Sequence, residues 1–440
     1  MGLLADTGID AVATVLEKVA VDVTFAESDG GHTGTNVVEV VIGVPNRLNY
    51  ILWLQDIVSA HDQILATQKR AVRGIDIGTG STAIYPLLGC KWDDTWNFIA
   101  TELDDESFVH ARENIARNNL DSRIQLRKAT RDGPILFPLE DKSCQIPGHP
   151  IDFTMCNPPF YGSRKEIDDS AEDKALMPNA VCTGADIEMI YANGGESGFV
   201  GRMVEESLEY QTSCRWFTSM LGKLSSVQNI VQRLRHHGIT NYAITEFVQG
   251  QTRRWAIGWS FLDVRLPDAV ARIQSIGPNH PLHSLLPQRT TLRQTFPETS
   301  SSSLRQALDE VLDLIPGIAI TGPVSGAVED AVSFVVEVSS DTWSRSARRK
   351  GKKAQDLKVS AISSKSTQIS TAQSPSPALT ASVTCQPTPF TSAQQHASDS
   401  RADSILAALE FQWVFGTDRG LYESFVSHIT RKVGNAVQKA

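Results

Sequence analysis

The chain has 440 residues, of which 41% are hydrophobic and 7% aromatic; this is the composition of ordinary globular protein, and the length suits two domains. A formal net charge of −9 excludes a globally basic nucleic-acid-binding protein, so any contact with a polyanion must come from a local basic patch. The six scattered cysteines include no C-x-x-C pair, which argues against a zinc site and a disulfide framework and favours a reducing compartment.

Residues 1–44 form an N-terminal segment without a targeting pattern. Its start, "MGLLADTGIDAVATVLEKVAVDV", lacks the basic flank and continuous apolar core of a signal peptide. No run along the chain reaches the roughly 18 apolar residues of a membrane span. We expect a protein of the nucleus or the cytoplasm that is neither secreted nor bound to a membrane.

Residues 45–266 alternate short apolar runs with amphipathic stretches, a pattern that predicts β-α-β units on a mainly parallel, Rossmann-like sheet. The expected strands include "RGIDI", "WNFIATE", "RIQLRKA", "IDFTM" and "CRWFTSML", and "DDESFVHARENIARNNL" has the pattern of a helix. The last two apolar runs, "YAITEFVQG" and "RWAIGWSFL", lie only a few residues apart. They predict a terminal antiparallel hairpin on this α/β sheet.

The remainder of the chain predicts a linker with a helical segment at 267–325 and an accessory α+β domain at 326–440. In that domain "VSFVVEV" predicts a strand, and "LAALEFQWVFGTDRGLYESFVSHITRKV" predicts a strand, a glycine turn and a closing helix. Between them, from about 355 to 400, the composition is Ser, Thr, Ala, Gln and Pro. Such a segment buries too little apolar surface to offset the entropy of ordering, so we expect a disordered insertion.

The first chemical motif is "GIDIGTGSTAIYPLLG", in which Asp76 closes a buried strand. It leads into Gly78 and Gly80, which permit a tight turn and close approach of the backbone to a nucleotide. Glu102 ends the next strand, where its carboxylate suits both ribose hydroxyls; the alternative is an acid that only stabilises a helix start. Gly78-x-Gly80-x-x-Ala83 also fits the dinucleotide fingerprint, so the turn alone leaves NAD and S-adenosylmethionine open.

The second motif, Asn157-Pro158-Pro159-Phe160, follows the apolar run "IDFTMC". Prolines cannot donate to a sheet ladder, so the strand must end there, at the edge of the sheet that carries the glycine turn. The Asn157 side-chain oxygen and the Pro158 carbonyl are two acceptors suited to an exocyclic amino group, and Phe160 offers a face for a planar base. This arrangement favours methyl transfer to an amino group over a dehydrogenase; a loop that merely ends the strand is the alternative.

Together these motifs carry a resemblance that extends over about residues 45–265. The chain resembles class I S-adenosylmethionine-dependent methyltransferases, and more closely the adenine N6-methyltransferase family of methyltransferase-like protein 16, which modifies U6 small nuclear RNA. The resemblance rests on "PNRLNYILWLQDI", "GIDIGTGSTAIYPLLG", "ATELDDESFVHARENIARNNL", "MCNPPF", "GGESGFVGRMVEESL", "RWFTSMLGK" and "EFVQGQTRRWAIGWSFL", which follow one another in the family's order.

The resemblance implies roles for individual positions. Arg47 is similar to the residue that binds the methionine carboxylate of the cofactor, and Gly80 and Glu102 to the cofactor-turn and ribose positions. Thr130 stands where the family contacts the cofactor adenine, and Lys128 falls in what resembles a regulatory loop. The catalytic set is then Asn157, Pro158, Pro159 and Phe160, which hold and stack the target adenine; no metal is expected.

Two basic features are candidates for RNA contact. The hairpin turn "QGQTRRW" presents Arg253 and Arg254, and "RSARRKGKK" includes Arg348, Arg349 and Lys350. Solvated faces or localisation signals are the alternative for such clusters. Members of the family usually have a basic module ahead of "PNRLNY", whereas residues 1–40 here are acidic to neutral, so we expect a truncated sequence or a different grip on RNA.

The sequence thus predicts an RNA adenine N6-methyltransferase that uses S-adenosylmethionine and acts on an unpaired adenine in structured RNA, with U6 small nuclear RNA as the substrate that the resemblance implies. Three alternatives stay open: a ribosomal RNA adenine methyltransferase, a protein glutamine methyltransferase and a non-catalytic RNA-binding module. The basic clusters favour RNA over protein as the substrate, and the retained Asp76, Glu102 and Asn157 favour an enzyme.

Overall fold

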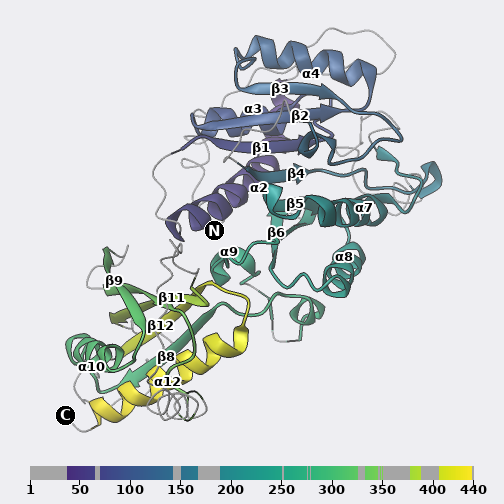
Figure 1. Ribbon diagram of the computed structural model, residues 1–440. Helices are drawn as coiled ribbons and strands as arrows, with labels where there is room; N and C mark the ends of the chain where they lie inside the picture. Colours follow the sequence, from purple (N-terminus) through teal and green to yellow (C-terminus); the bar gives the residue numbers. More distant parts are fainter. Residues whose placement is uncertain are drawn as a thin grey trace, which may run out of the picture. The chain divides into compact units, whose positions relative to one another are not determined.

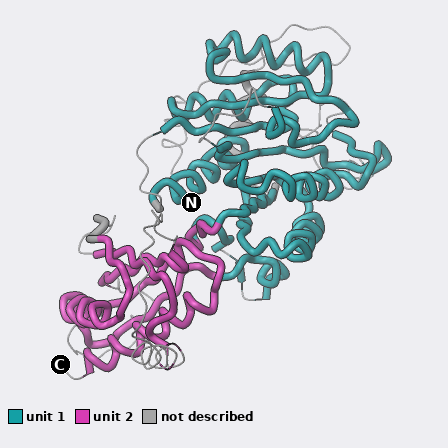
Figure 2. The backbone as a smooth tube through the Cα atoms, viewed as in Figure 1, with its two compact units in different colours: residues 1–262, 269–288 teal, residues 263–268, 289–440 magenta. Residues whose placement is uncertain are grey.

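The protein consists of two compact units that interleave along the chain (Figure 2). The computed structural model describes residues 37–64, 70–141, 150–166, 189–249, 252–274, 276–277, 279–325, 332–344, 347, 349, 377–387 and 406–438. The first unit takes in Met1–Leu262 and Ala269–Gln288, and the second Asp263–Asp268 and Arg289–Ala440. The chain therefore contributes a six-residue piece, 263–268, to the second unit before it completes the first.

A seven-stranded sheet forms the centre of the first unit, in the order β3-β2-β1-β4-β5-β7-β6 (Figure 1). Its strands are β1 (Val72–Ile77), β2 (Trp96–Glu102), β3 (Ile124–Lys128), β4 (Ile151–Cys156), β5 (Cys214–Leu221), β6 (Tyr242–Gln249) and β7 (Thr252–Trp259). Strands β1 to β5 pair in parallel, and β7 runs antiparallel to β5 and β6. This confirms the predicted mainly parallel, Rossmann-like sheet with a terminal antiparallel hairpin.

Helices connect the strands of the first unit and cover the sheet. They are α2 (Val37–Ile64), α3 (Ile84–Trp92), α4 (Asp105–Arg117), α7 (Gly195–Tyr210), α8 (Leu224–His236) and α9 (Asp268–Ala271), with 3-10 turns η1 (Phe137–Leu139), η2 (Gln211–Ser213) and η3 (Pro281–Ser284). Helix α2 packs against α3 and β6, and α7 packs against α8 and β5. Helix α4 begins where the Asp104 carboxylate caps the Ser107 N–H (2.8 Å). None of the helices in the described ranges is long and apolar enough to cross a membrane.

The central strand β4 is buried along its whole length, as a strand covered on both faces must be. Phe153 projects from it between Trp96 and Phe98, with ring centroids 5.1 and 5.8 Å away. The neighbouring strand has Gly74 opposite, where a Cβ would lie 2.4 Å from the Phe153 ring. Strands β1 and β4 therefore fit together only with glycine at this position, which fixes the spacing of the two strands that lead to the motifs.

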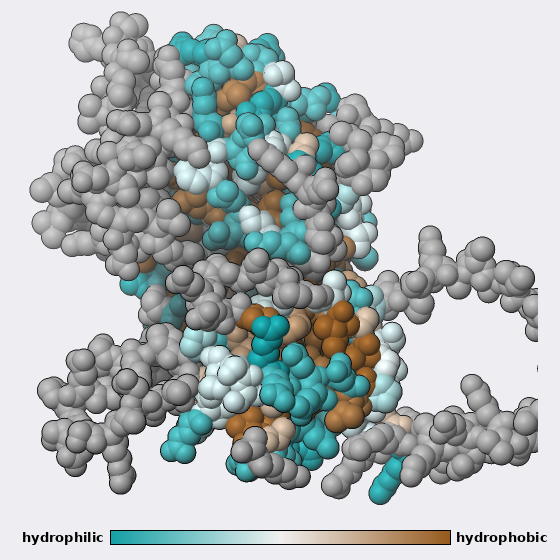
Figure 3. All heavy atoms as spheres, turned by 90° about the vertical axis from the view of Figure 1, so that its left-hand side faces the viewer, coloured by the Kyte–Doolittle hydropathy of each residue, from teal (hydrophilic) through white to brown (hydrophobic). Residues whose placement is uncertain are grey.

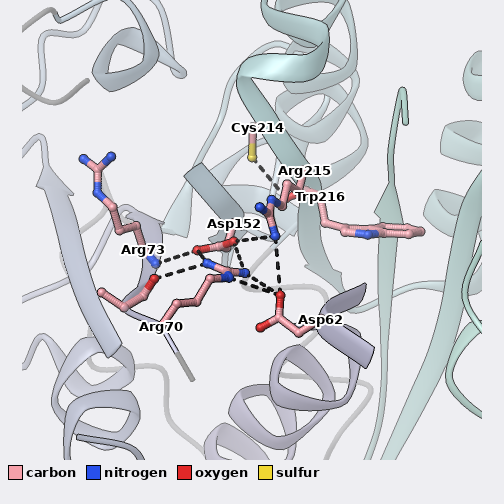
Figure 4. Close-up of polar contacts among 8 residues, drawn as sticks. Asp62, Arg70, Arg73, Asp152, Cys214, Arg215 and Trp216 are labelled. Atoms are coloured by element: carbon pink, nitrogen blue, oxygen red, sulfur yellow. Dashed lines mark hydrogen bonds and ion pairs between the residues drawn. The ribbon is translucent and has the colours of Figure 1, made fainter. Parts of the chain in front are cut away.

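A partly buried ion-pair network holds the amino end of β4 (Figure 4). Asp152, only 2% exposed, accepts two hydrogen bonds from the Arg70 guanidinium (2.9 and 2.7 Å) and one from the Arg73 backbone N–H (2.8 Å). Asp62 of α2 also accepts from Arg70 (2.9 Å), and Arg215 of β5 lies 3.4–3.5 Å from both carboxylates. The network joins α2, β4 and β5 at the edge of the sheet opposite the sequence motifs.

The second unit is an α+β fold built on a five-stranded antiparallel sheet, in the order β8-β12-β11-β10-β9. Its elements are β8 (Thr291–Pro297), α10 (Ser301–Asp313), β9 (Ile318–Ser325), β10 (Val332–Val338), β11 (Leu379–Pro387), β12 (Leu406–Phe415) and α12 (Arg419–Val437). Helices α10 and α12 pack on each other and on the sheet, with Val336, Val383 and Phe425 in the shared core. Figure 3 shows one face of the molecule, on which hydrophobic side chains lie among hydrophilic ones.

Two details of the second unit differ from the sequence expectation. Strand β11 lies inside the segment expected to be disordered, because Leu379, Ala381, Val383 and Cys385 alternate toward the core within a Ser/Thr-rich composition. The segment expected to be a linker and helix, 267–325, supplies β8, α10 and β9 to the second unit, while its first part, 269–288, belongs to the first. The predicted strand and closing helix after residue 400 are confirmed as β12 and α12.

Candidate functional site

The two sequence motifs meet at the carboxyl edge of the sheet, where the strand order reverses between β1 and β4. Ile77, the last residue of β1, is paired with Cys156 of β4 on one side and with Thr101 of β2 on the other. The glycine turn after β1, the carboxylate at the end of β2 and the Asn-Pro-Pro-Phe loop after β4 are therefore neighbours. Such a reversal point is where open α/β sheets bind ligands.

The glycine turn has a backbone that only glycine adopts at low cost. Gly78 and Gly80 have φ angles of 67° and 68°, in the left-handed region. A Cβ built on either residue would have no heavy atom within 4 Å, so the space in front of the turn is open. The Thr79 N–H between them donates to the Thr101 carbonyl (2.8 Å) and ties the turn to β2. The turn thus combines a fixed backbone with room for a ligand against it.

Glu102 holds the glycine turn from the neighbouring strand. Its buried carboxylate accepts hydrogen bonds from the Gly80 N–H (2.8 Å) and from the N–H groups of Leu103 and Asp104 (2.7 and 2.8 Å). Sequence reasoning assigned Glu102 to a ribose and missed this bond, although a carboxylate about 20 residues after a glycine turn was the available signal. The ribose contact stays a prediction beside this structural role.

Asp76 is a buried carboxylate at the end of β1. It is 1% exposed, and neither oxygen bonds to any residue that the structure describes; the same holds for the Thr79 hydroxyl. Burial raises the pKa of Asp76 to about 7, and the nearby charge of Glu102 also raises it. Thr79 is close enough to lower this pKa, although no hydrogen bond of normal geometry joins the two side chains. Unpaired buried polar atoms beside an open turn fit a ligand that brings its own polar groups.

Asp76→Asn is expected to stabilise the protein in the absence of ligand. A folded-state pKa near 7 exceeds the ordinary value of about 4, so between these pH values the folded protein binds more protons than the unfolded one and stability falls as pH rises. Asparagine resembles the protonated acid, so the substitution should raise the free energy of unfolding on the order of 1–3 kcal/mol at pH 8 and by less at pH 5. Urea unfolding at both pH values measures this, with Asp121→Asn as the exposed control. An equal effect at the two pH values would contradict the assignment.

The Asn157-Pro158-Pro159-Phe160 loop leaves the sheet with its amide side chain in solvent. Asn157 is exposed and makes no hydrogen bond to another described residue, whereas Pro158 is buried. Tyr50 of α2 anchors the strand just before the loop: its hydroxyl accepts from the Cys156 N–H (3.4 Å) and shares a 2.8 Å hydrogen bond with Thr218 of β5. The "PNRLNY" motif therefore positions the end of β4 through its tyrosine, a role that sequence reasoning did not assign.

Phe160 is partly buried beside the terminal hairpin. The Arg254 guanidinium of β7 lies over its ring, 5.3 Å from the centroid. Arg253, the neighbouring residue, is half exposed and pairs instead with Glu246 of β6 (3.1 Å). Of the two hairpin arginines, the structure thus brings Arg254 to the Asn-Pro-Pro-Phe loop and holds Arg253 on the hairpin itself.

Charged residues from three motifs influence one buried tyrosine, Tyr85 of α3. Its hydroxyl donates to the Met220 sulfur (3.3 Å), and burial raises its pKa strongly. The positive charges of Arg47 and Arg254 lower this pKa, and the charge of Asp76 raises it, so all three side chains lie within electrostatic reach of the hydroxyl. Arg47, Asp76 and Arg254 thus share one charged environment around Tyr85, a residue that sequence reasoning did not name.

The remaining predicted positions lie farther from this centre or beyond the described residues. Thr130 is exposed just after Ala129, whose N–H donates to the Glu102 carbonyl (2.8 Å), so it belongs to the same edge of the sheet. Lys128 pairs with Asp105 (2.6 Å) at the start of α4. Arg349 is exposed in the second unit, and the other two residues of that predicted cluster, Arg348 and Lys350, lie outside the described residues. No group of three metal-ligating side chains occurs in the described part of the chain.

Comparisons with known proteins agree on one family. A family model described as RNA methyltransferase matches residues 38–263. The U6 small nuclear RNA (adenine-(43)-N(6))-methyltransferase of Schizosaccharomyces pombe is 32% identical over 88% of this chain and 85% of its own. The RNA N(6)-adenosine-methyltransferase mettl16 of Xenopus laevis is 34% identical over 77% of this chain, and the human METTL16 is 41% identical over 50%. This chain spans 62% of the frog protein and 38% of the human one.

Two solved structures of human METTL16 are similar to this chain. The human METTL16 catalytic domain in complex with MAT2A 3'UTR hairpin 6 is 35% identical, covering 58% of this chain and 82% of that one, with a TM-score of 0.46. The N-terminal domain of human METTL16 in complex with SAH is 32% identical over 58% of this chain and 83% of that one, with a TM-score of 0.42.

Proposed function

The chain belongs to the RNA methyltransferase family whose model covers residues 38–263, and from this membership we propose that it transfers a methyl group from S-adenosylmethionine to N6 of an unpaired adenine in structured RNA. U6 small nuclear RNA is the proposed substrate, because relatives that align with this chain carry that RNA in their names. A nuclear location follows from that substrate as part of the proposal.

The observation that carries this proposal is the meeting of two half-sites at one edge of the sheet. The cofactor half consists of the open glycine turn and the Asp76 carboxylate, which has no hydrogen-bond partner among the described residues. The amino-group half contains the exposed amide of Asn157, at the end of β4, the strand that pairs with β1. A cofactor half and an amino-group half in adjacent positions are what methyl transfer to a base requires.

The cofactor half fits S-adenosylmethionine through the chemistry of its donors. The backbone at Gly78 and Gly80 would hold the adenosyl part, and the Asp76 carboxylate would pair with the cationic methionine amino group. The Arg47 guanidinium suits the methionine carboxylate, with which it forms a planar, bidentate pair. When bound, S-adenosylmethionine supplies an electrophilic methyl group. Asn157, Glu102 and Thr130 complete the set of residues that we assign to this half.

The catalytic half acts by orienting an amine. The lone pair of the adenine N6 nitrogen is delocalised into the ring, so this amine is a poor nucleophile. The Asn157 oxygen and the Pro158 carbonyl accept its two hydrogens and turn the lone pair toward the methyl group, while Pro159 keeps the loop rigid and Phe160 stacks on the base. The base must leave its helix or be unpaired to reach this loop.

RNA contact is assigned to local basic groups on the acidic chain. Arg254 stands beside Phe160, and Arg253 lies on the adjacent hairpin surface. The cluster with Arg348, Arg349 and Lys350 would add phosphate contacts from the second unit, with a dependence of affinity on salt concentration.

The test is methyl transfer from labelled S-adenosylmethionine to a U6 hairpin, with the product digested to nucleosides and identified by mass spectrometry. The proposal expects N6-methyladenosine at one unpaired adenine. Two control RNAs carry guanine at that position or a complementary strand that pairs it, and neither should be labelled. Methyl transfer to another base, or none to any RNA by a chain that binds the cofactor, would refute the proposed reaction.

A further inference from the structure

A buried glutamate on α7 connects the loops that follow β4 and β5. Glu196 is 2% exposed, and its two carboxylate oxygens accept hydrogen bonds from the backbone N–H groups of Gly222 (2.6 Å) and Lys223 (2.9 Å). Lys223 is the N-cap residue of α8 and has no side-chain cap of its own. Glu196 therefore caps α8 from a different helix and fixes the backbone at the end of β5.

Gly222, which Glu196 holds, is the surface against which the ring of Phe160 rests. A Cβ added at Gly222 would lie 3.0 and 3.2 Å from two carbon atoms of that ring. The ring thus packs on bare backbone with no space for a methyl group between them. Where Gly222 is placed decides where the Phe160 ring is placed.

Gly195, the residue before Glu196, packs against the backbone at the end of the Asn-Pro-Pro-Phe loop. Gly195 has a φ of 58°, and a Cβ there would lie 3.1 Å from the Phe160 carbonyl oxygen and from the Gly162 nitrogen. Glu166 holds the chain just after the loop, because its carboxylate accepts from the Gly162 N–H (2.7 Å) and from the Lys223 ammonium group. The loop is consequently held between α7 and the residues that Glu196 fixes.

We propose that Glu196 is a positioning residue for methyl transfer, which sets the angle of the Phe160 ring by holding Gly222 and Lys223 against the Asn-Pro-Pro-Phe loop. The inference rests on the proposed function, since it assigns Glu196 to the site at which the target adenine stacks. It goes beyond helix capping, because capping alone would stabilise α8 without affecting the reaction.

Two substitutions test this inference by different physical routes. Glu196→Gln keeps the size of the side chain but turns an NH₂ group toward one of the two backbone donors, so one hydrogen bond is lost. Gly222→Ala keeps the Glu196 carboxylate but adds a methyl group 3.0 Å from the ring and 3.2 Å from Glu196 Oε2, so it displaces the ring by steric pressure rather than by loss of an acceptor. The matched control is Glu206→Gln on the same helix, whose carboxylate accepts from the Leu136 N–H (2.8 Å) and pairs with Arg202.

We expect Glu196→Gln and Gly222→Ala each to lower kcat roughly tenfold. The KM for RNA and the Kd for S-adenosylmethionine should stay within about twofold, because neither residue is among those that we assign to the cofactor or to RNA. Glu206→Gln should lower stability to a similar degree as Glu196→Gln without changing kcat. A kcat equal to wild type in both test variants, or an equal loss in the control, overturns the inference.

Two measurements that need no turnover separate this inference from the proposed function. Amide hydrogen exchange at residues 222 and 223 should be faster in Glu196→Gln, and 2-aminopurine at the target position of a bound hairpin should be less quenched in both test variants. A wild-type chain that transfers no methyl group refutes the proposed function only. Unchanged exchange together with unchanged quenching refutes the role of Glu196.

Discussion

Replacement of Asn157 by alanine is expected to lower kcat for adenine methylation on the order of 10²–10³-fold, the usual effect of removing one precisely placed polar group from a transition state. The exposed side chain makes no hydrogen bond to another described residue, so we expect its removal to affect the proposed reaction rather than folding. Without its oxygen, one of the two acceptors for the N6 hydrogens is lost and the lone pair stays in the ring. The free energy of unfolding should change by less than about 0.5 kcal/mol.

Single-turnover kinetics with labelled cofactor measure this effect, and calorimetry gives the Kd for S-adenosylmethionine and for the hairpin separately. The control is Asn97→Ala, on β2, whose amide donates to the Thr95 carbonyl (3.0 Å) at the opposite edge of the sheet. It should leave the single-turnover rate unchanged. A rate of Asn157→Ala within threefold of wild type would show that the loop does not orient the amine.

Arg70→Met is expected to destabilise the first unit by about 3 kcal/mol. The substitution removes both hydrogen bonds from the guanidinium to Asp152, which is left as a buried carboxylate with reduced compensation. Breaking a buried ion pair at one partner typically costs 3–5 kcal/mol, and we place this case at the lower end because Arg70 is 20% exposed and Arg215 lies 3.4 Å from Asp152.

Urea unfolding followed by tryptophan fluorescence measures this loss. The matched control is Arg233→Met, which removes a 3.5 Å pair with Glu205 in which both side chains are nearly half exposed, and it should cost less than about 1 kcal/mol. The double variant Arg70→Met with Asp152→Asn should lose less than the sum of the two single variants, since no charge is then stranded. If Arg70→Met and the control lose the same free energy of unfolding, the network contributes no more to stability than an exposed ion pair.

Much of the first unit could be predicted because short stretches of its sequence are enough to indicate its strands and turns. Strands that are buried on both faces appear as continuous apolar runs, and the left-handed turn appears as Gly78 and Gly80. The pairing of the two motifs then followed from the rule that parallel strands end at one edge of a sheet.

Other parts of the site could not be predicted because they depend on residues far apart in the sequence. Glu196 acts on Gly222 and Lys223, 26 and 27 residues away, and its motif "GGES" looks locally like an ordinary helix start. Asp152 occupies a polar position in a strand, and its partner Arg70 lies 82 residues earlier. In the second unit, the Ser/Thr-rich composition of β11 concealed a period-two pattern that the pairing with β10 and β12 brings out.

The interleaving of the two units also bears on how the chain folds during synthesis. Residues 269–288 complete the first unit: the Trp53 indole donates to the Val270 carbonyl (3.1 Å) and the Tyr242 hydroxyl to the Leu285 carbonyl (2.9 Å). By then the ribosome has already released 263–268, whose Arg265 bonds to Gly416, 151 residues later. Once residues up to Gln288 have emerged from the ribosome, the first unit can therefore be complete, while residues 263–268 still lack β12, the strand of the second unit to which they bond.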